Sequence, residues 1–555
     1  MNREHLGYCI GVLKPDEVIF TSVEPPSLGE FVVVESNEGD KTVRILGIVK
    51  GVERFDRFIG NDSYSPEVVE SIINVHKSHG IFRSYVSILG MIDGNDLKNL
   101  RHPPKPASPV YRADKELLES IFSKGGSSHI PVGTLLTSGD VKVYVDLDQI
   151  ASRHLAVLAI TGGGKSNAVS VILEEIAKKR GTVIVVDVHG EYENAEYLDE
   201  RGENVVHPID VKINLSELSA DEIATLCGID FDRSGRQYFV LQKLVECVRR
   251  MREAKKIINI RNDVAKNGYV GGFDENNEDK SDNLPPFIDD LIKTLEVLIE
   301  YRSNKGKSEE EEYDLEGELG EIYEIIKLCS FVNYLKKDEL IGVHIRLNNL
   351  RTKLRNRIDD NYQPLIEQIK HGYINVLRMK DLDYDAMDVI LSHLLYQLLN
   401  ERKKAIHGFE SKIKVPVIVV IEEAHIFAPW DSTTRTKEAL SKVAREARKF
   451  GLGIILVSQR PKGLDSNILS QMNNWIILRI VEPEDQRHIQ RASETLSGDL
   501  LNYLSALNPG EAILLGPFVK IPLLVKFRKS QAKKSGSDIS ATEEWSKWKM
   551  NYYLK

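Results

Sequence analysis

The stretch 159–167, with the sequence AITGGGKSN, constrains the fold of this 555-residue chain more than any other feature. An apolar run at 155–160 precedes it and predicts a buried strand, and 168–179 carries apolar residues at helical spacing. A strand, a glycine-rich loop, Lys-Ser and a helix are the setting of a phosphate-binding loop, or P-loop. Its backbone N–H groups and the positive end of the helix dipole both attract phosphate. The sequence therefore predicts a nucleotide site here.

The loop residues divide the work of holding a nucleotide. Lys165 reaches the β- and γ-phosphates, and the Ser166 hydroxyl takes a Mg²⁺ position, so ATP and Mg²⁺ are the expected cofactors. Ala159 replaces the usual first glycine, and because alanine is the smallest substitute we expect the loop to survive. The predicted nucleotide contacts are Thr161, Gly162, Gly163, Gly164, Lys165, Ser166 and Asn167.

Paired acids follow a second apolar run, at 415–421. Glu422 is the expected Mg²⁺ ligand, and Glu423 is the expected catalytic base for the attacking water. A third run, at 182–186, ends in Asp187, which we expect at the metal or at a water near the nucleotide. Two alternatives stay open: Asp187 caps the segment that follows it, and the paired acids only begin a helix, where the dipole favours negative charge.

A fourth run, at 453–457, leads to Gln459, whose amide can donate to and accept from the γ-phosphate or the attacking water. The helix expected at 436–450 carries Arg445 and Arg448 near its end. These side chains form either a solvated face or an arginine finger that enters a neighbouring subunit's site.

The rest of the chain predicts several domains. Short strand-like runs over 1–100 suggest a small antiparallel barrel, and four prolines at 101–109 suggest an extended connector. Long helical periodicities interrupted by acidic stretches at 272–284 and 304–320 suggest a helical insertion. The expected order is the following: barrel 1–100, connector and short helix 101–128, first core part 129–232, insertion 233–370, second core part 371–529 and tail 530–555.

Composition narrows the class of protein further. No apolar run approaches a membrane span, and the N-terminus has no signal-peptide core. The four cysteines lie far apart and make no metal-spaced pair or plausible disulfide framework, which favours a reducing, cytoplasmic setting. With a net charge of −9, any nucleic acid must be held by a local basic surface or channel.

Taken in order, these motifs resemble the HerA family of archaeal DNA-translocating ATPases, in the HerA–FtsK group of RecA-like motors. The motifs are TGGGKSN at 161–167, DVHGEY at 187–192, EEAH at 422–425, REARKFG at 445–451, SQRP at 458–461 and GPFVKIP at 516–522. The resemblance implies a RecA-like α/β core with a mainly parallel sheet and a HAS-type N-terminal barrel. It also implies a homo-hexamer that threads duplex DNA through a central pore, and a NurA-type nuclease as partner in DNA end resection.

Two residue roles follow from the resemblance alone. The family's arginine that acts on a neighbouring subunit matches Arg448, and a second arginine at the nucleotide matches Arg153. The leading hypothesis is an ATP-driven DNA translocase or helicase in double-strand break repair, with Arg435, Lys437 and Lys462 as candidate DNA contacts. The alternatives are a ring ATPase that moves protein or packages or conjugates DNA, and a clamp that binds nucleotide without useful turnover.

Overall fold

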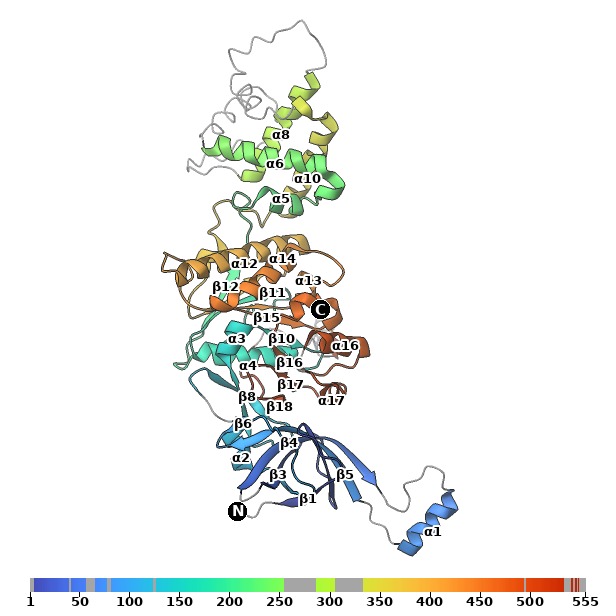
Figure 1. The fold of residues 1–555 in the computed structure, drawn as a ribbon. Helices are drawn as coiled ribbons and strands as arrows, with labels where there is room; N and C mark the ends of the chain where they lie inside the picture. The colour runs from blue at the N-terminus through green and yellow to red at the C-terminus, as the bar shows by residue number, and fades with distance from the viewer. Residues whose placement is uncertain are drawn as a thin grey trace. The chain divides into compact units, whose positions relative to one another are not determined.

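The computed structural model describes residues 4–38, 41–55, 65–76, 81–122, 126–253, 286–304, 333–493, 496–533 and, in the tail, 541–542, 545–546 and 548. The chain divides into two compact units (Figure 1). The first contains 1–208, 370–376 and 399–555, and the second contains 209–369 and 377–398. Each unit is described separately.

The N-terminal part of the first unit is the expected small barrel. Its strands are β1 (His5–Ile10), β2 (Glu17–Ser22), β3 (Phe31–Glu38), β4 (Lys41–Phe55), β5 (Ile81–Asp93), β6 (Asp96–Lys98) and β7 (Pro109–Arg112). They pair in the order β2-β1-β7-β3-β4-β5-β6, and an added β2–β5 pairing closes six of them into a barrel. Helix α1 (Pro66–His76) lies between β4 and β5 in sequence.

The barrel extends past the expected boundary at residue 100. Strand β7 follows the proline-rich segment and pairs with both β1 and β3. The segment therefore connects two strands of the barrel and is not a linker between domains. Because β7 is only four residues long and follows several prolines, its apolar pattern is too short to predict a strand. The barrel and the core sheet of this unit share one hydrophobic cluster, in which Phe31 packs on Phe122 of helix α2 (Lys115–Phe122) with ring centroids 5.3 Å apart.

The core of the first unit is an 11-stranded mixed sheet with strand order β12-β13-β11-β14-β15-β10-β16-β17-β18-β8-β9. Its strands are β8 (His129–Leu135), β9 (Lys142–Asp146), β10 (Leu155–Leu158), β11 (Thr182–Asp187), β12 (Val206–Asp210), β13 (Ile374–Arg378), β14 (Val417–Ile421), β15 (Leu452–Ser458), β16 (Asn474–Ile477), β17 (Glu511–Leu515) and β18 (Leu523–Phe527). Strands β11, β14, β15, β10 and β16 run parallel, whereas β16 through β9 pair antiparallel. The expected α/β P-loop core is confirmed, and its parallel half carries the site.

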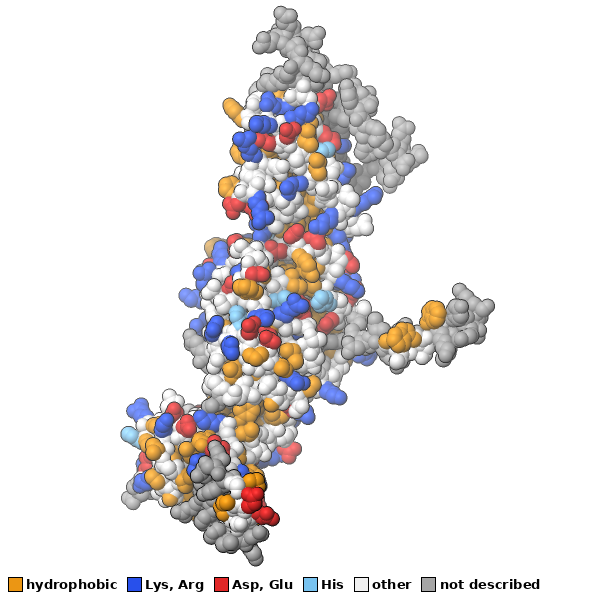
Figure 2. All heavy atoms as spheres, turned by 90° about the vertical axis from the view of Figure 1, so that its right-hand side faces the viewer, with side chains coloured by type: hydrophobic (Ala, Val, Ile, Leu, Met, Phe, Trp, Pro, Cys, Tyr) orange, Lys and Arg blue, Asp and Glu red, His pale blue; other side chains and the backbone are white. Residues whose placement is uncertain are grey.

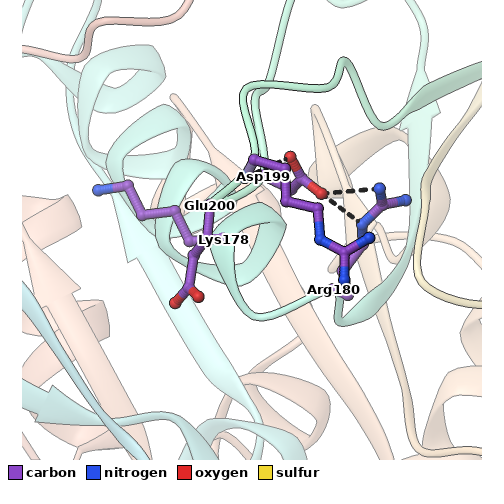
Figure 3. A pocket seen from close by; sticks show the side chains of 5 residues that line it. Lys178, Arg180, Asp199 and Glu200 are labelled. Carbon is purple, nitrogen blue, oxygen red and sulfur yellow. Dashed lines mark hydrogen bonds and ion pairs between the residues drawn. The ribbon is translucent and has the colours of Figure 1, made fainter.

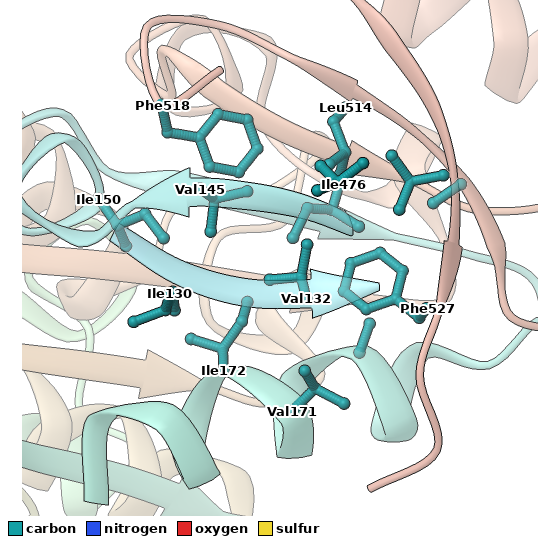
Figure 4. Close-up of a cluster of buried hydrophobic side chains, with 14 of the residues drawn as sticks. Ile130, Val132, Val145, Ile150, Val171, Ile172, Ile476, Leu514, Phe518 and Phe527 are labelled. Carbon is teal, nitrogen blue, oxygen red and sulfur yellow. The ribbon is translucent and has the colours of Figure 1, made fainter. Parts of the chain in front are cut away.

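The core sheet is buried where the site is built. Every residue of β10, β11, β14 and β15 is buried, as expected for parallel strands covered on both faces. Helix α4 (Lys165–Lys178) covers one face, and Figure 4 shows its Val171 and Ile172 packed beside Ile130 and Val132 of β8. This packing fixes the strand and the helix that flank the P-loop.

The second unit is the helical insertion, and it begins earlier than expected, at residue 209 instead of 233. Its helices are α5 (Ala220–Leu226), α6 (Phe231–Glu253), α8 (Phe287–Asn304), α10 (Lys337–Lys353), α11 (Leu365–Gln368) and most of α12 (Tyr384–Ile406). Apolar side chains such as Leu244, Leu295 and Leu347 are buried within it. Apart from Asn304, both acidic stretches lie outside the described residues.

Cysteine use departs from expectation. Cys9 and Cys227 are free and buried, but Cys247 is disulfide-bonded, so the expectation that the chain forms no disulfide is wrong for this residue. The aromatic tail is described only in part: Trp545 and Trp548 are exposed, whereas Tyr552 and Tyr553 lie outside the described residues. Among the described residues, no helix has the length and apolar character to cross a membrane.

Candidate nucleotide site

The P-loop connects buried β10 to α4 through glycines whose backbone conformation favours glycine. Gly162 and Gly164 have φ of 76° and 96°, in the left-handed region that favours glycine. A Cβ on Gly164 would lie 2.8 Å from the backbone nitrogen of Gly510 in the same chain, so close packing also requires glycine there. Ala159 is fully buried and is not among the described non-glycine residues with positive φ, so the loop tolerates alanine at this position.

Lys165 lies between the two predicted acids. Its Nζ is 2.8 Å from Glu423 Oε1 and 3.6 Å from Glu422 Oε2, and all three residues are buried. The strands bring them together from positions more than 250 residues apart, because β10 and β14 are both neighbours of β15 and run parallel to it. Ser166 follows Lys165 in the first turn of α4.

Glu423 is held from several sides. Its backbone is in the left-handed region, with φ of 47° and ψ of 44°, immediately before the short helix α13 (Ala424–Phe427). Such strain persists only where the surroundings fix it, and it is common at functional sites. Burial raises the pKa of Glu423, but the hydrogen bond and charge of Lys165, with His425 and Gln459, outweigh it and lower the pKa overall. The carboxylate is therefore ionised, and it accepts the hydrogen bonds of Lys165 and Gln459.

Gln459 contacts both Glu423 and the P-loop. It follows β15, and its Nε2 donates to Glu423 Oε1 at 2.7 Å, while its Oε1 accepts from the Thr161 hydroxyl at 2.7 Å. One amide thus contacts the loop that surrounds a phosphate and the carboxylate that would activate water. Contact of Gln459 with a γ-phosphate or water stays a prediction.

Asp187 is occupied by its own loop. Its carboxylate accepts N–H bonds from Gly190 at 2.8 Å, Glu191 at 3.0 Å and Tyr192 at 2.9 Å. Burial raises its pKa despite these bonds. These contacts match the alternative in which Asp187 caps the segment that follows it.

Sequence reasoning missed two residues that contact the paired acids. The buried Tyr192 hydroxyl donates to Glu422 Oε1 at 2.6 Å, and His425 Nδ1 lies 3.3 Å from Glu423 Oε2 and 3.3 Å from the Ser458 hydroxyl. Burial lowers the pKa of His425. Both residues lie inside the quoted motifs DVHGEY and EEAH, which were the available signal.

The donor set fits Mg²⁺ held together with a nucleotide. Within the described ranges, no group of three or more His, Cys, Asp and Glu side chains is arranged to hold a metal alone. Mg²⁺ keeps several waters and is usually bound by one or two carboxylates plus substrate phosphates. Glu422 and Ser166 beside the P-loop meet that description.

Asn167 is not turned to a nucleotide. Its Nδ2 donates to the Arg528 carbonyl at 2.8 Å, and its Oδ1 accepts from the Ser530 N–H at 2.9 Å. Arg528 in turn pairs with Glu174 and Glu175 of α4. Asn167 therefore ties the segment after β18 to the P-loop helix.

The three predicted arginines lie at the opposite end of the parallel strands. Arg153 ends helix α3 (Leu147–Arg153) just before β10, Arg445 is in the last turn of α14 (Arg435–Glu446), and Arg448 is in the 3₁₀ helix η2 (Ala447–Lys449) just before β15. Strand β15 is seven residues long, which is about 23 Å at 3.3 Å per residue. Exposed Arg448 and the Gln459 of the same chain are therefore too far apart to share one nucleotide.

A polar cavity of about 350 Å³ lies at the other end of α4 (Figure 3). Lys178, Arg180, Asp199, Glu200 and Arg201 line it, and Arg180 pairs with Asp199. Helix α4 has 14 residues, so this cavity is about 20 Å from the P-loop and separate from the candidate site.

Comparison with known proteins agrees with these motifs. The family model "Helicase HerA, central domain" matches residues 130–398, and "Helicase HerA-like C-terminal" matches 361–516. The chain is 35% identical to "Probable helicase MJ1565" of Methanocaldococcus jannaschii, over 98% of this chain and 95% of that protein. It is 33% identical to "DNA double-strand break repair helicase HerA" of Sulfolobus acidocaldarius, over 98% and 97% of the two chains.

Solved structures resemble the chain more remotely. The bacterial conjugative coupling protein TrwB, in its unbound monoclinic form, aligns with 77% of this chain and 94% of that chain, with a TM-score of 0.42 and 11% identity. The family resemblance of the sequence motifs is confirmed by the family models and by full-length relatives from archaea. The chain belongs to the HerA helicase family.

Proposed function

We propose that this protein is an ATP-driven translocase and helicase of double-stranded DNA that acts in the repair of double-strand breaks. The observation that carries the proposal is the placement of Glu423, which is ionised, strained and held between Lys165 of the P-loop and Gln459. Named relatives that the chain matches over almost their full length are break-repair helicases, which supports the DNA part.

Each residue of the site has a proposed role in binding or hydrolysing ATP. The backbone of 161–165 and the Lys165 ammonium bind the phosphates of ATP, and Ser166 with Glu422 would hold Mg²⁺, whose charge offsets the negative charge on the phosphates. Lys165 then interacts with phosphate oxygens in addition to Glu423, which leaves that carboxylate able to orient water and accept its proton. Gln459 contacts both Glu423 and the P-loop residue Thr161, so it can relay whether a γ-phosphate is present.

The position of the arginines supports a ring. Because Arg448 lies at the far end of β15 from its own P-loop, it can complete a site only on a neighbouring subunit. There its guanidinium would stabilise the charge that develops as the phosphate is transferred. We propose a homo-hexamer on this basis and on family membership, with Arg153 and Arg445 beside Arg448 on the same face.

The candidate DNA contacts Lys437 and Lys462 are also part of this proposal. Lys437 is engaged in shaping its own loop, since its Nζ contacts the Pro429 carbonyl at 2.8 Å and Asp465 at 2.8 Å, and Lys462 pairs with Glu484. On the face of the molecule shown in Figure 2, acidic and basic side chains are interspersed with one another. We propose that duplex DNA passes through the central pore of the ring, where subunits combine their contacts, and that a NurA-type nuclease uses the motor in end resection.

The test is ATP hydrolysis with and without linear duplex DNA. The wild-type protein should be stimulated by DNA, and Lys165→Ala should abolish hydrolysis, because the phosphates lose their cation. Lys178→Ala at the other end of α4 is the matched control and should behave as wild type. Hydrolysis indifferent to DNA would contradict the proposal and favour a ring ATPase that moves protein.

A further inference from the structure

His154 occupies a backbone conformation that a histidine rarely adopts. It follows α3, is 2% exposed, and has φ of 60° and ψ of 167°. This region is populated essentially by glycine, because a Cβ is strained there. A non-glycine residue persists in such a place when its surroundings hold it, so the side chain of His154 invites a functional explanation.

Both ring nitrogens of His154 bind backbone groups of other elements. The Ile454 N–H in β15 donates to Nδ1 at 3.1 Å, and Nε2 is 3.1 Å from the Ala444 carbonyl in α14. Because a carbonyl only accepts, the hydrogen is on Nε2 and the ring is neutral. Burial lowers the pKa of His154 to about 4, which agrees with a neutral ring.

The Ala444 bond acts where α14 ends. The last four carbonyls of a helix have no partner inside it, and Ala444 is among them. Just beyond, the chain tightens into η2, which contains Arg448 one turn after Ala444. The imidazole therefore caps the segment that presents Arg448.

The surroundings of His154 are tightly packed. A Cβ on Gly453 would lie 2.8 Å from the Ala151 Cα, so α3 lies directly against β15. Buried Asn474 donates from Nδ2 to the His154 carbonyl at 2.8 Å and to the Gln149 carbonyl at 3.0 Å. Helix α3 also packs on η2, so Arg153 and Arg448 are carried by two elements in contact.

We propose that His154 is a positioning residue, whose Nε2 bond to the Ala444 carbonyl holds Arg448 in place for a neighbouring subunit's nucleotide. This inference rests on the proposed role of Arg448 in the neighbouring site. Through β10 and β15, the same imidazole is connected to the P-loop and to Gln459 at the other ends of these strands. His154 thus links the subunit's own site to the arginine that it donates.

Two variants separate this role from simple packing, because each keeps one of the two bonds. In His154→Gln the terminal amide reaches the place of Nε2 and can still donate to Ala444. In His154→Asn the side-chain oxygen takes the place of Nδ1 and can still accept from Ile454, but nothing reaches Ala444. Asparagine also tolerates positive φ better than glutamine does.

The proposal predicts that the two variants rank in one order by turnover and in the opposite order by stability. His154→Asn should be the more stable protein yet lose roughly tenfold or more in kcat, since small misplacements of a catalytic group are costly. His154→Gln should be less stable yet keep kcat within about threefold of wild type. Dissociation constants for a fluorescent ATP analogue should be unchanged in both, because the P-loop is untouched.

The measurements are kcat of the full-length protein with linear duplex DNA, nucleotide binding and the urea unfolding midpoint. Ile150→Val, which trims a buried side chain of α3 and leaves both hydrogen bonds of the His154 ring in place, is the matched control and should keep wild-type kcat. If His154→Gln loses kcat as much as His154→Asn, or if kcat follows stability, the proposal is overturned.

A double-mutant cycle tests whether His154 acts through Arg448. Arg448→Lys keeps a charge but loses the guanidinium fork, so a reduced rate should remain measurable. Adding His154→Asn to Arg448→Lys should cause little further loss, whereas an additional tenfold loss would overturn the proposal alone. Wild-type turnover by Arg448→Lys and by Arg448→Ala would overturn this inference and the proposed in-trans role together, while DNA stimulation of the wild type would still stand.

Discussion

The two ends of the parallel strands differ in how far the polar side chains there are buried and bonded to one another within the same chain. At the carboxyl ends, Lys165, Glu423 and Gln459 are buried or half-buried and bonded to one another. At the amino ends, the cations Arg445 and Arg448 are exposed, on a segment that the neutral His154 holds. One end therefore brings its polar side chains together within a single chain, whereas we propose that the other end serves a second copy of the chain.

Arg448→Ala tests the amino end and should have the largest effect. We expect kcat for ATP hydrolysis to fall by about 10³-fold, the lower range for an arginine finger, with nucleotide binding almost intact. Steady-state hydrolysis with DNA measures it. Lys449→Ala, in the same short helix and also exposed, is the control. Equal losses in both variants would show that the helix, and not the guanidinium, matters.

Glu423→Gln tests the carboxyl end. The amide keeps the shape but cannot accept a proton from water, so we expect kcat to fall by about 10²- to 10³-fold. Equilibrium binding of a fluorescent ATP analogue should remain within a few-fold of wild type. Turnover close to wild type would remove Glu423 as the base and leave Glu422 as the remaining candidate.

Low pH should weaken the fold partly through His154. Its pKa is about 4 in the folded chain and 6.5 when unfolded, so the unfolded state binds the proton first. Stability contributed by this group is therefore present above pH 6.5 and is lost as pH falls toward 4, by about 3 kcal/mol. Urea unfolding at pH 7 and pH 4 measures the change. His154→Asn should reduce this pH dependence, and an identical dependence would contradict the assignment.

Tyr192→Phe should have the smallest effect. It removes the hydroxyl that donates to Glu422, so we expect the Mg²⁺ concentration for half-maximal hydrolysis to rise by about tenfold at unchanged maximal rate. Tyr197→Phe is the matched control, since that buried hydroxyl contacts Ser170 instead. A shift of equal size in Tyr197→Phe would mean that packing and not the Glu422 contact is responsible.

Sequence alone predicted the parts whose signals are local. Buried parallel strands are continuous apolar runs, so the runs before Asp187, Glu422 and Gln459 were identified together with the chemistry at their ends. The family models then confirmed the family resemblance. The short strand β7 carries a weaker pattern, and the expected barrel boundary missed it.

The unpredicted parts depend on distant contacts. Tyr192 meets Glu422 across 230 positions, and His154 meets Ala444 across 290 positions. Asn167 carries a plausible side chain for a nucleotide site, yet backbone groups of the segment after β18 occupy it. The spacing of apolar residues along the sequence cannot predict such partners, because these contacts form only when the strands pair in the folded protein.

The most direct test of the account is to mix two inactive proteins. Glu423→Gln lacks the base, and Arg448→Ala lacks the arginine given to a neighbour. If each working site combines the carboxyl end of one subunit with the amino end of the next, mixed rings contain some intact sites, and DNA-stimulated ATP hydrolysis should reappear, well above either variant alone. Hydrolysis that stays at the sum of the separate variants, in rings shown to exchange subunits, would contradict the account.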